Sequence, residues 1–109
     1  MIQEIKTVAE YDAMTAENAV AVVHFGFKWN SFDRMMMRTL TELEAEFTGK
    51  IALGFLDIDQ NATIDVLKQI KIVNVPTLAY FKNGEHLATT VGMRTMDDVR
   101  TQIAALISE

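Results

Sequence analysis

Few residues in this sequence could carry out chemistry, and the residue type that is missing restricts the possibilities most. The chain contains no cysteine, which excludes disulfides, thiolate metal sites, cysteine nucleophiles and every thiol redox cycle. The two histidines, His24 and His86, and the carboxylates show neither the HExxH spacing of zinc enzymes nor the loop spacing of an EF-hand. We therefore expect no metal site and no cofactor.

The charge and the apolar pattern of the chain restrict its partners. Ten Lys and Arg residues against fifteen Asp and Glu residues give a formal net charge of −5, which argues against nucleic acid or anionic lipid as a main partner. No apolar stretch approaches the ~20 residues that cross a bilayer, and the start MIQEIKT lacks the pattern of a signal peptide. We expect a cytoplasmic protein without a membrane partner, a single domain (1–109) that is monomeric or a weak homodimer.

The spacing of apolar residues predicts the elements that must position any site. Runs of β-branched and aromatic residues predict buried strands at 20–25 and 51–58, and a shorter stretch at 2–5 predicts an edge strand. Apolar residues at three- and four-residue steps predict a helix over 31–47 with one buried stripe, and Gly49 ends this helix. The predicted stripe comprises Phe32, Met35, Met36, Leu40, Leu43 and Phe47.

Three further helices and a hairpin complete the predicted order. Thr7 and Glu10 open a predicted helix over 8–14, and a second helix around 64–70 is expected to bury Ile64, Leu67 and Ile70. Asn83 and Gly84 join a predicted hairpin of 78–81 and 86–91. The last helix starts at about residue 95 and is expected to bury Val99, Ile103 and Leu106. Along the chain, the strand–helix–strand crossovers come first and the hairpin comes last. This order predicts an α/β fold, a central mixed sheet of four to five strands with helices on both faces.

This order of elements resembles the thioredoxin family over nearly the whole chain, and several motifs agree with it. VVHFGFKWN resembles the strand that leads into the family's Trp-Cys active-site loop, with Trp29 at the position of its tryptophan. DIDQN at 57–61 resembles the third strand and its loop, and FKNGE with the later Gly92 resembles the final hairpin. NVPT at 74–77 resembles the segment that carries the cis-proline. The resemblance implies the thioredoxin fold, with a cis-proline at Pro76.

The departures from the family lie in its active site. Where thioredoxins have Trp-Cys-Gly-Pro-Cys-Lys, this chain has Trp29, Asn30, Ser31, Phe32, Asp33 and Arg34. Dithiol–disulfide exchange needs two thiols, and neither Asn30 nor Asp33 supplies one. The aspartate and the lysine that the family buries beneath this site correspond to His24 and Phe55, so the resemblance implies a redox role that was abandoned long ago.

The replacements suggest a structural role for the old active site. Asn30 is a good N-cap residue, and Asp33 could reach back to the start of the helix as in a capping box. The resemblance also places His24 beneath Asp33, where a hydrogen bond between the two would satisfy both buried groups. An acid–base site of His24, Asp33 and Ser31 is an alternative, and it requires an open pocket that holds all three.

The resemblance further implies a peptide-binding face that survives without the cysteines. In the family, the loop before the cis-proline offers a backbone N–H and C=O to an extended chain, which requires no thiol. The residues expected on this remnant active-site face are Trp29, Asn30, Ser31, Phe32, Asp33, Val75, Pro76, Thr77 and Gly92. We therefore expect a redox-inactive, non-enzymatic protein that binds a protein or extended peptide, with Trp29 and Phe32 as aromatic anchors.

Other interpretations stay open. Trp29 could pack against its own loop and Phe32 could turn into the core. The chain could then be a structural subunit of an oligomer or complex, and its contact surface could be a sheet edge or the helix that carries Met35, Met36 and Met37. At least one of these methionines must be exposed, because consecutive helical residues point about 100° apart. It could also share the family's role in cell redox homeostasis without dithiol chemistry of its own.

Overall fold

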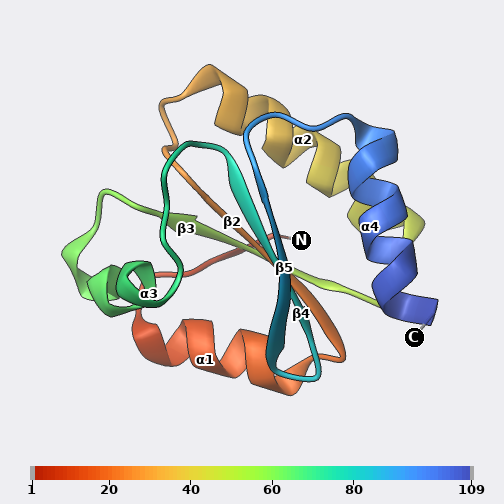
Figure 1. Ribbon diagram of the computed structural model, residues 1–109, viewed down its shortest axis with the longest axis horizontal. Helices are drawn as coiled ribbons and strands as arrows, with labels where there is room; N and C mark the ends of the chain where they lie inside the picture. Colours follow the sequence, from red (N-terminus) through yellow and green to blue (C-terminus); the bar gives the residue numbers. More distant parts are fainter. Residues whose placement is uncertain (1, 109) are drawn as a thin grey trace.

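A five-stranded mixed sheet forms the centre of the computed structural model, which describes residues 2–108 (Figure 1). The strands are β1 (Gln3–Glu4), β2 (Val20–Gly26), β3 (Ala52–Asp57), β4 (Thr77–Lys82) and β5 (Glu85–Val91). They lie in the order β1-β3-β2-β4-β5, in which β1, β3 and β2 are parallel while β4 and β5 are antiparallel to their neighbours. The predicted mixed sheet is confirmed.

Helices cover both faces of this sheet. They are α1 (Val8–Glu17), α2 (Ser31–Glu46), the 3-10 turn η1 (Asn61–Thr63), α3 (Ile64–Gln69) and α4 (Met96–Ser108). Figure 1 shows α2 and α4 on one face of the sheet and α1 and α3 on the other. None of the helices within residues 2–108 combines the length and the apolar character that a bilayer crossing requires.

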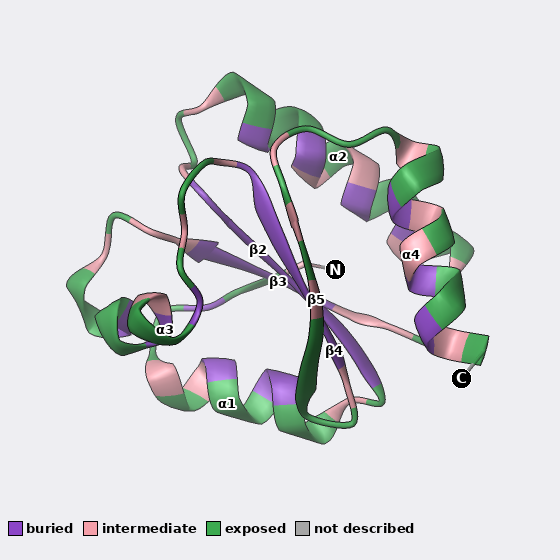
Figure 2. Ribbon diagram, in the orientation of Figure 1, coloured by how far each residue is buried: buried purple, intermediate pink, exposed green. Residues whose placement is uncertain are grey.

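Two apolar clusters fill the layers between the sheet and the helices. The cluster under α1 and α3 includes Tyr11, Met14 and Val66, and the cluster under α2 and α4 includes Leu40 and Ile103. Strand β2 separates the two clusters and is buried along its whole length (Figure 2), as its continuous apolar run predicted. Strand β5 is a sheet edge and is mostly exposed.

The predicted buried stripe of α2 is wrong at its first turn. The helix buries Met36, Leu40 and Leu43, but Phe32 and Met35 are exposed and the stripe begins with Asp33. Residues 33, 36, 40 and 43 follow the three- and four-residue steps of one helical face, whereas Phe32 lies about 100° away from Asp33. A carboxylate therefore occupies a core position at the start of α2.

The predicted buried face of α3 is also wrong in part. Val66 and Ile70 are buried, but Ile64 is exposed. Two residues along a helix turn the side chain by about 200°, so the face that buries Val66 points Ile64 away from the sheet. Helix α1 also extends to Glu17, three residues past its predicted end.

Candidate functional site

Strand register brings the two segments of the predicted site to one end of the sheet. Phe25 of β2 pairs with Thr77 of β4, so the residues that follow β2 lie beside the residues that precede β4. The Val75–Pro76 peptide bond is cis, and the carbonyl of Pro76 accepts a hydrogen bond from the Gly92 N–H at 2.8 Å. The loop after β2, the loop before β4 and the end of β5 therefore meet at this end.

Asn30 caps α2, as its residue type predicted. Its Oδ1 accepts hydrogen bonds from the backbone N–H groups of Phe32 at 2.9 Å and Asp33 at 3.2 Å. These two donors have no partner inside the helix, so the side chain satisfies them. Ser31, the first residue of α2, is exposed.

Asp33 takes no part in a capping box and instead forms the predicted pair with His24. Its Oδ1 lies 2.8 Å from Nε2 of His24, and its Oδ2 accepts a hydrogen bond from the Phe27 N–H at 2.9 Å. Both side chains are fully buried. A capping box would require the carboxylate to reach the Asn30 N–H, but that group already donates to the Phe27 carbonyl, and the carboxylate has better partners inside.

Gly26 leaves the space that Asp33 occupies, a role that sequence reasoning missed. A Cβ atom at position 26 would lie 2.1 Å from Oδ1 and 2.4 Å from Cγ of Asp33, distances that no pair of such atoms can keep. Residues 24 and 26 point to the same face of β2, and Asp33 approaches that face from α2. His24, Gly26 and Asp33 therefore form one packing unit, which we name the buried triad.

An apolar wall closes the buried triad beneath His24. The ring of Phe55 packs edge-on against the imidazole, with ring centroids 4.9 Å apart. Nδ1 of His24 is buried and has no hydrogen-bond partner among the described residues. Since the Asp33 carboxylate only accepts hydrogen bonds, the pairing assigns a ring proton to Nε2.

The enclosure of the pair counts against the acid–base alternative. His24 and Asp33 have no exposed side-chain surface, whereas Ser31 lies outside on the surface. General acid–base catalysis needs the proton-transferring group within hydrogen-bond reach of a substrate. In the described part of the chain, the three side chains therefore share no open pocket.

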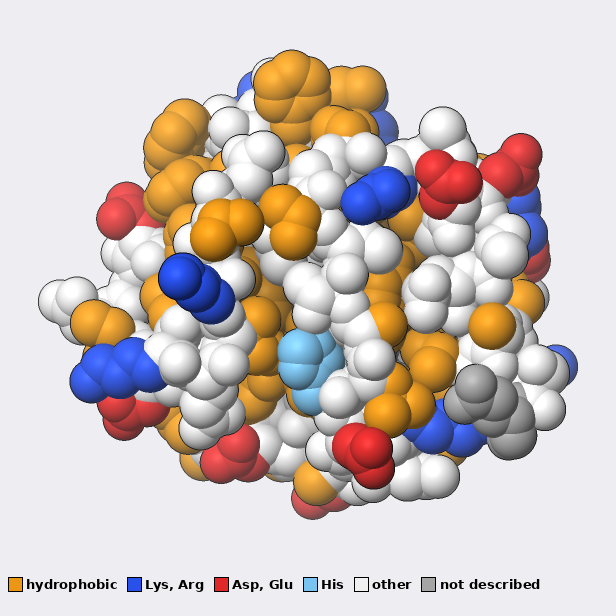
Figure 3. Space-filling model, in the orientation of Figure 1, with side chains coloured by type: hydrophobic (Ala, Val, Ile, Leu, Met, Phe, Trp, Pro, Cys, Tyr) orange, Lys and Arg blue, Asp and Glu red, His pale blue; other side chains and the backbone are white. Residues whose placement is uncertain are grey.

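Outside the buried triad, two aromatic side chains are exposed. The side chains of Trp29 and Phe32 are 66% and 55% exposed. Trp29 also stacks on Phe27, with centroids 4.8 Å apart, and the guanidinium group of Arg34 donates to its carbonyl at 2.9 Å. Figure 3 shows hydrophobic side chains gathered at the top of the molecule, where α2 begins. Trp29 thus packs on its own loop and still presents an apolar surface, while Phe32 points away from the core.

The loop before β4 places its predicted residues in different environments. Thr77 is fully buried, and its Oγ1 donates to the Asn74 carbonyl at 2.6 Å. Pro76 is also buried, whereas Val75 is half-buried. The prediction that Thr77 lies on a binding face is therefore wrong for its side chain, because the hydroxyl is needed to close the loop.

Gly92 completes the remnant surface beside Pro76. It has a φ angle of +85°, and a Cβ atom there would meet nothing within 4 Å, so the surface is open at this point. We use the name remnant face for the accessible apolar part of the predicted site. It comprises Trp29, Phe32, Val75 and Gly92.

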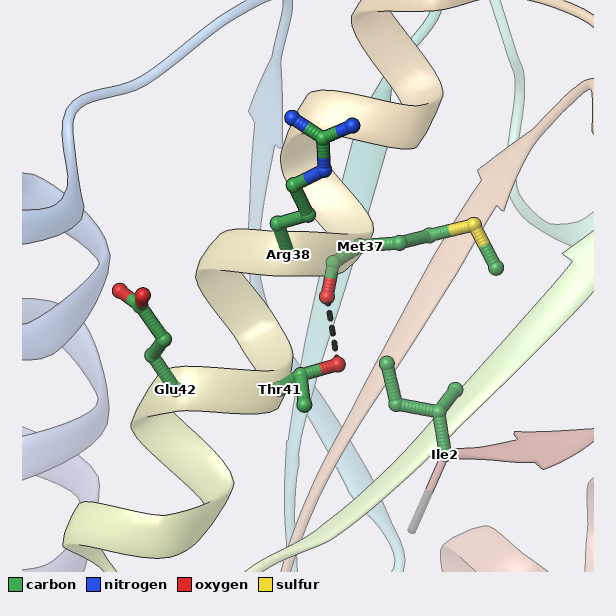
Figure 4. Close-up of a pocket in the computed structure, with 5 residues that line it drawn as sticks. All are labelled: Ile2, Met37, Arg38, Thr41 and Glu42. Carbon is green, nitrogen blue, oxygen red and sulfur yellow. Dashed lines mark hydrogen bonds between the residues drawn. The ribbon is translucent and has the colours of Figure 1, made fainter.

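The three consecutive methionines of α2 point in three directions, as expected. Met36 is in the core, Met35 is exposed, and Met37 is half-buried. Met37 borders a cavity of about 560 Å³ on the side of α2 near Ile2 (Figure 4), and no residue of the buried triad lines it. On the same side of α2, Thr41 Oγ1 donates a hydrogen bond to the Met37 carbonyl at 2.8 Å.

No group of three or more His, Asp or Glu side chains in residues 2–108 is placed to hold a metal ion.

Comparison with known proteins supports the expected family. Residues 3–105 match the family model described as Thioredoxin. A thioredoxin from Staphylococcus aureus is 29% identical over 93 residues, which cover 85% of this chain and 86% of that protein. A thioredoxin variant from Halobacterium salinarum superposes with a TM-score of 0.86 at 23% identity, covering 96% of this chain and 89% of that one. Thioredoxin from Trypanosoma brucei brucei gives a TM-score of 0.86 at 16% identity, covering 100% and 93%.

Proposed function

Because this chain belongs to the thioredoxin family and has no cysteine, we propose that it is a redox-inactive protein that binds an extended segment of a partner protein. The proposed binding surface is the remnant face. Disulfide exchange requires an attacking and a resolving thiol, and Asn30 and Asp33 stand where the family has them. The chain shares the fold of its family, and the proposal is that it has kept this surface.

The observation that carries the proposal is the exposure of apolar side chains on a well-anchored loop. Trp29 and Phe32 are mostly exposed, although the loop between them is held by the Asn30 cap and by the Asp33 carboxylate. A soluble protein gains nothing in stability from two exposed aromatic rings, whereas aromatic residues frequently anchor interfaces. A rigid loop also loses little conformational entropy when a partner binds.

The backbone next to Val75 supports recognition of an extended chain. The Val75 N–H donates a hydrogen bond to Oδ1 of Asn74 at 2.9 Å. The Asn74 side chain is exposed, so an incoming strand can displace it. Among the described residues, none donates to the Val75 carbonyl. One donor and one acceptor are the groups that strand addition uses.

An affinity capture with folded full-length variants tests the proposal. Phe32→Ala and Val73→Arg alter the proposed surface and the loop beside it, where Val73 is 70% exposed. Leu87→Arg is the matched control, because Leu87 is an exposed apolar residue on the edge strand β5. A partner retained by the wild type and Leu87→Arg, but lost by the other two variants, is the expected result.

Other outcomes of the capture separate the alternatives. Loss of the partner in Leu87→Arg alone would assign binding to the sheet edge and refute the proposal. Equal retention by all variants would mean that the old active site is only structural. In that case the half-buried Met37 and the cavity beside it would be the next surface to alter.

A further inference from the structure

A groove continues the remnant face between α2 and the segment that joins β5 to α4. It has a volume of about 490 Å³, and its lining includes Met35, Arg38, Met93, Arg94 and Met96. Met35 lies one helical turn after Phe32, and Met93 directly follows Gly92, so both walls begin at residues of the remnant face. A chain bound on that face would enter this groove next.

The groove has an apolar part made of methionine. Met35 is 50% exposed and Met93 is 41% exposed, and Met96 is half-buried beside them. Methionine side chains are unbranched and flexible, so they adapt to apolar groups of different shape. This part of the groove suits one aliphatic or aromatic side chain.

Two arginines on the groove lack a carboxylate partner. Arg38 makes no hydrogen bond or ion pair among the described residues, and Figure 4 shows its guanidinium group directed away from Glu42. Arg94 donates only to the Val91 carbonyl, at 3.4 Å. By contrast, Arg100 on α4 pairs with the carboxylates of Glu46 and Asp97.

This arrangement stands out against the charge of the whole chain. Fifteen Asp and Glu residues against ten Lys and Arg residues give a net charge of −5, but no carboxylate among the described residues lines the groove. The nearest acidic residues along the chain are Asp97 and Asp98 in the first turn of α4, and Asp33 and Glu42 on α2. Asp33 is buried against His24, and Glu42 lines the cavity near Ile2, which Arg38 also borders. Asp97 is paired with Arg100, and Asp98 lines a second hollow, which Arg94 also borders, without a hydrogen bond or ion pair between the two side chains. Two guanidinium groups therefore face solvent beside an apolar floor.

We propose that this groove selects a partner segment in which acidic residues flank an apolar one. The carboxylates would bind Arg38 and Arg94, and the apolar side chain would lie on Met35 and Met93. Arginine offers a fork of N–H donors that matches a carboxylate, and such charge-assisted hydrogen bonds are stronger than neutral ones. The inference rests on the proposed binding function, because the groove only extends the remnant face.

The test compares two short fluorescein-labelled peptides by fluorescence anisotropy. One alternates glutamate and leucine, and the other has glutamine in place of glutamate. The wild-type protein should bind the glutamate peptide about tenfold more tightly. The preference should fall when ionic strength rises from about 0.01 M to about 0.15 M, which shortens the Debye length from about 30 Å to about 8 Å.

Matched charge variants locate the preference. Arg38→Glu should abolish the preference for the glutamate peptide, whereas Arg38→Lys should keep part of it because the charge remains. Lys50→Glu makes the same change of charge at an exposed residue in the turn after α2, and it should leave the preference unchanged. Equal loss in Lys50→Glu would overturn the inference, since the attraction would then come from overall charge.

Two further outcomes also overturn the inference. If both peptides bind equally and only Phe32→Ala weakens them, the remnant face binds chains without this selection, and the proposed function stands alone. If the wild type binds neither peptide and instead dimerises in sedimentation velocity until Arg38→Glu prevents it, the groove holds a second copy of the chain.

Discussion

The two sides of the first turn of α2 invert the usual distribution of side chains. Toward the core, this turn places the carboxylate of Asp33 against the imidazole of His24, and both are fully buried. Toward solvent, the same turn presents Phe32, and the loop before it presents Trp29. Polar groups are inside and aromatic groups are outside, although the hydrophobic effect favours the opposite arrangement.

The two sides of this turn are expected to have different roles, the inner side in stability and the outer side in binding. On the inner side, the Asp33 carboxylate binds His24 Nε2 and the Phe27 N–H and occupies the space that the missing Cβ of Gly26 leaves, so both of its oxygens have partners within the fold. The outer side leaves apolar area in water, which the proposed partner would cover. Substitutions inside should therefore change the free energy of unfolding, while substitutions outside should change binding.

Among substitutions in the buried triad and the loop around it, Asp33→Ala should have the largest effect on stability. It removes the acceptor of His24 Nε2 and of the Phe27 N–H, and it leaves a buried donor and a part-buried donor beside a cavity. We expect the free energy of unfolding to fall by about 3 kcal/mol or more, measured by urea denaturation. Asp33→Asn keeps the volume and one acceptor, so it should lose less.

A double variant tests whether His24 and Asp33 act as a pair. Replacing both residues by leucine removes both polar groups, so neither is left without its partner. The double variant should be more stable than Asp33→Leu alone, because the single substitution leaves the buried imidazole of His24 without its hydrogen-bond partner. Losses that simply add would show that the two residues contribute independently.

Gly26→Ala should have the second largest effect. The new methyl group would overlap the Asp33 carboxylate, and shifting that carboxylate weakens its hydrogen bonds. We expect a loss of about 2 kcal/mol in the free energy of unfolding. In the background of Asp33→Ala, the same substitution should cost much less because the space is then free; an equal cost in both backgrounds would mean that the clash is with another group.

The elements of the fold could be predicted because each has a local cause. The continuous apolar run at 20–25 predicted a strand covered on both faces, and Asn83 with Gly84 predicted the hairpin turn between β4 and β5. Asn83 has a φ of +50° and Gly84 a φ of +85°, the left-handed conformations that such a turn requires. Local rules suffice where neighbours in sequence decide the outcome.

The interior of the site could be predicted only in part, because distant residues decide it. Phe32 and Asp33 are adjacent, and apolar spacing alone favours burying the phenylalanine. The buried choice is Asp33 because His24 and the Phe27 N–H offer it hydrogen bonds. The resemblance to thioredoxins indicated the first partner, but the need for Gly26 follows only from the three-dimensional distance to Asp33.

Asn30→Ala should have a moderate effect. It removes the acceptor for the Phe32 and Asp33 N–H groups at the start of α2, and loss of such a cap costs about 1 kcal/mol. Ser31→Ala is the neighbouring control, because Ser31 is exposed and its side chain makes no hydrogen bond in the described residues. Equal melting temperatures for the two variants would contradict the capping role.

Phe32→Ala should have the smallest effect on stability and the largest on binding. The ring is mostly exposed, so its removal should change the free energy of unfolding by no more than about 0.5 kcal/mol. Met36→Ala in the same helix should cost about 2 to 5 kcal/mol, because Met36 is fully buried. The partner should nevertheless be retained by folded Met36→Ala and released by Phe32→Ala. If urea denaturation instead showed a large loss for Phe32→Ala, the exposed ring would be part of the core in solution, and the inversion across this turn would not exist.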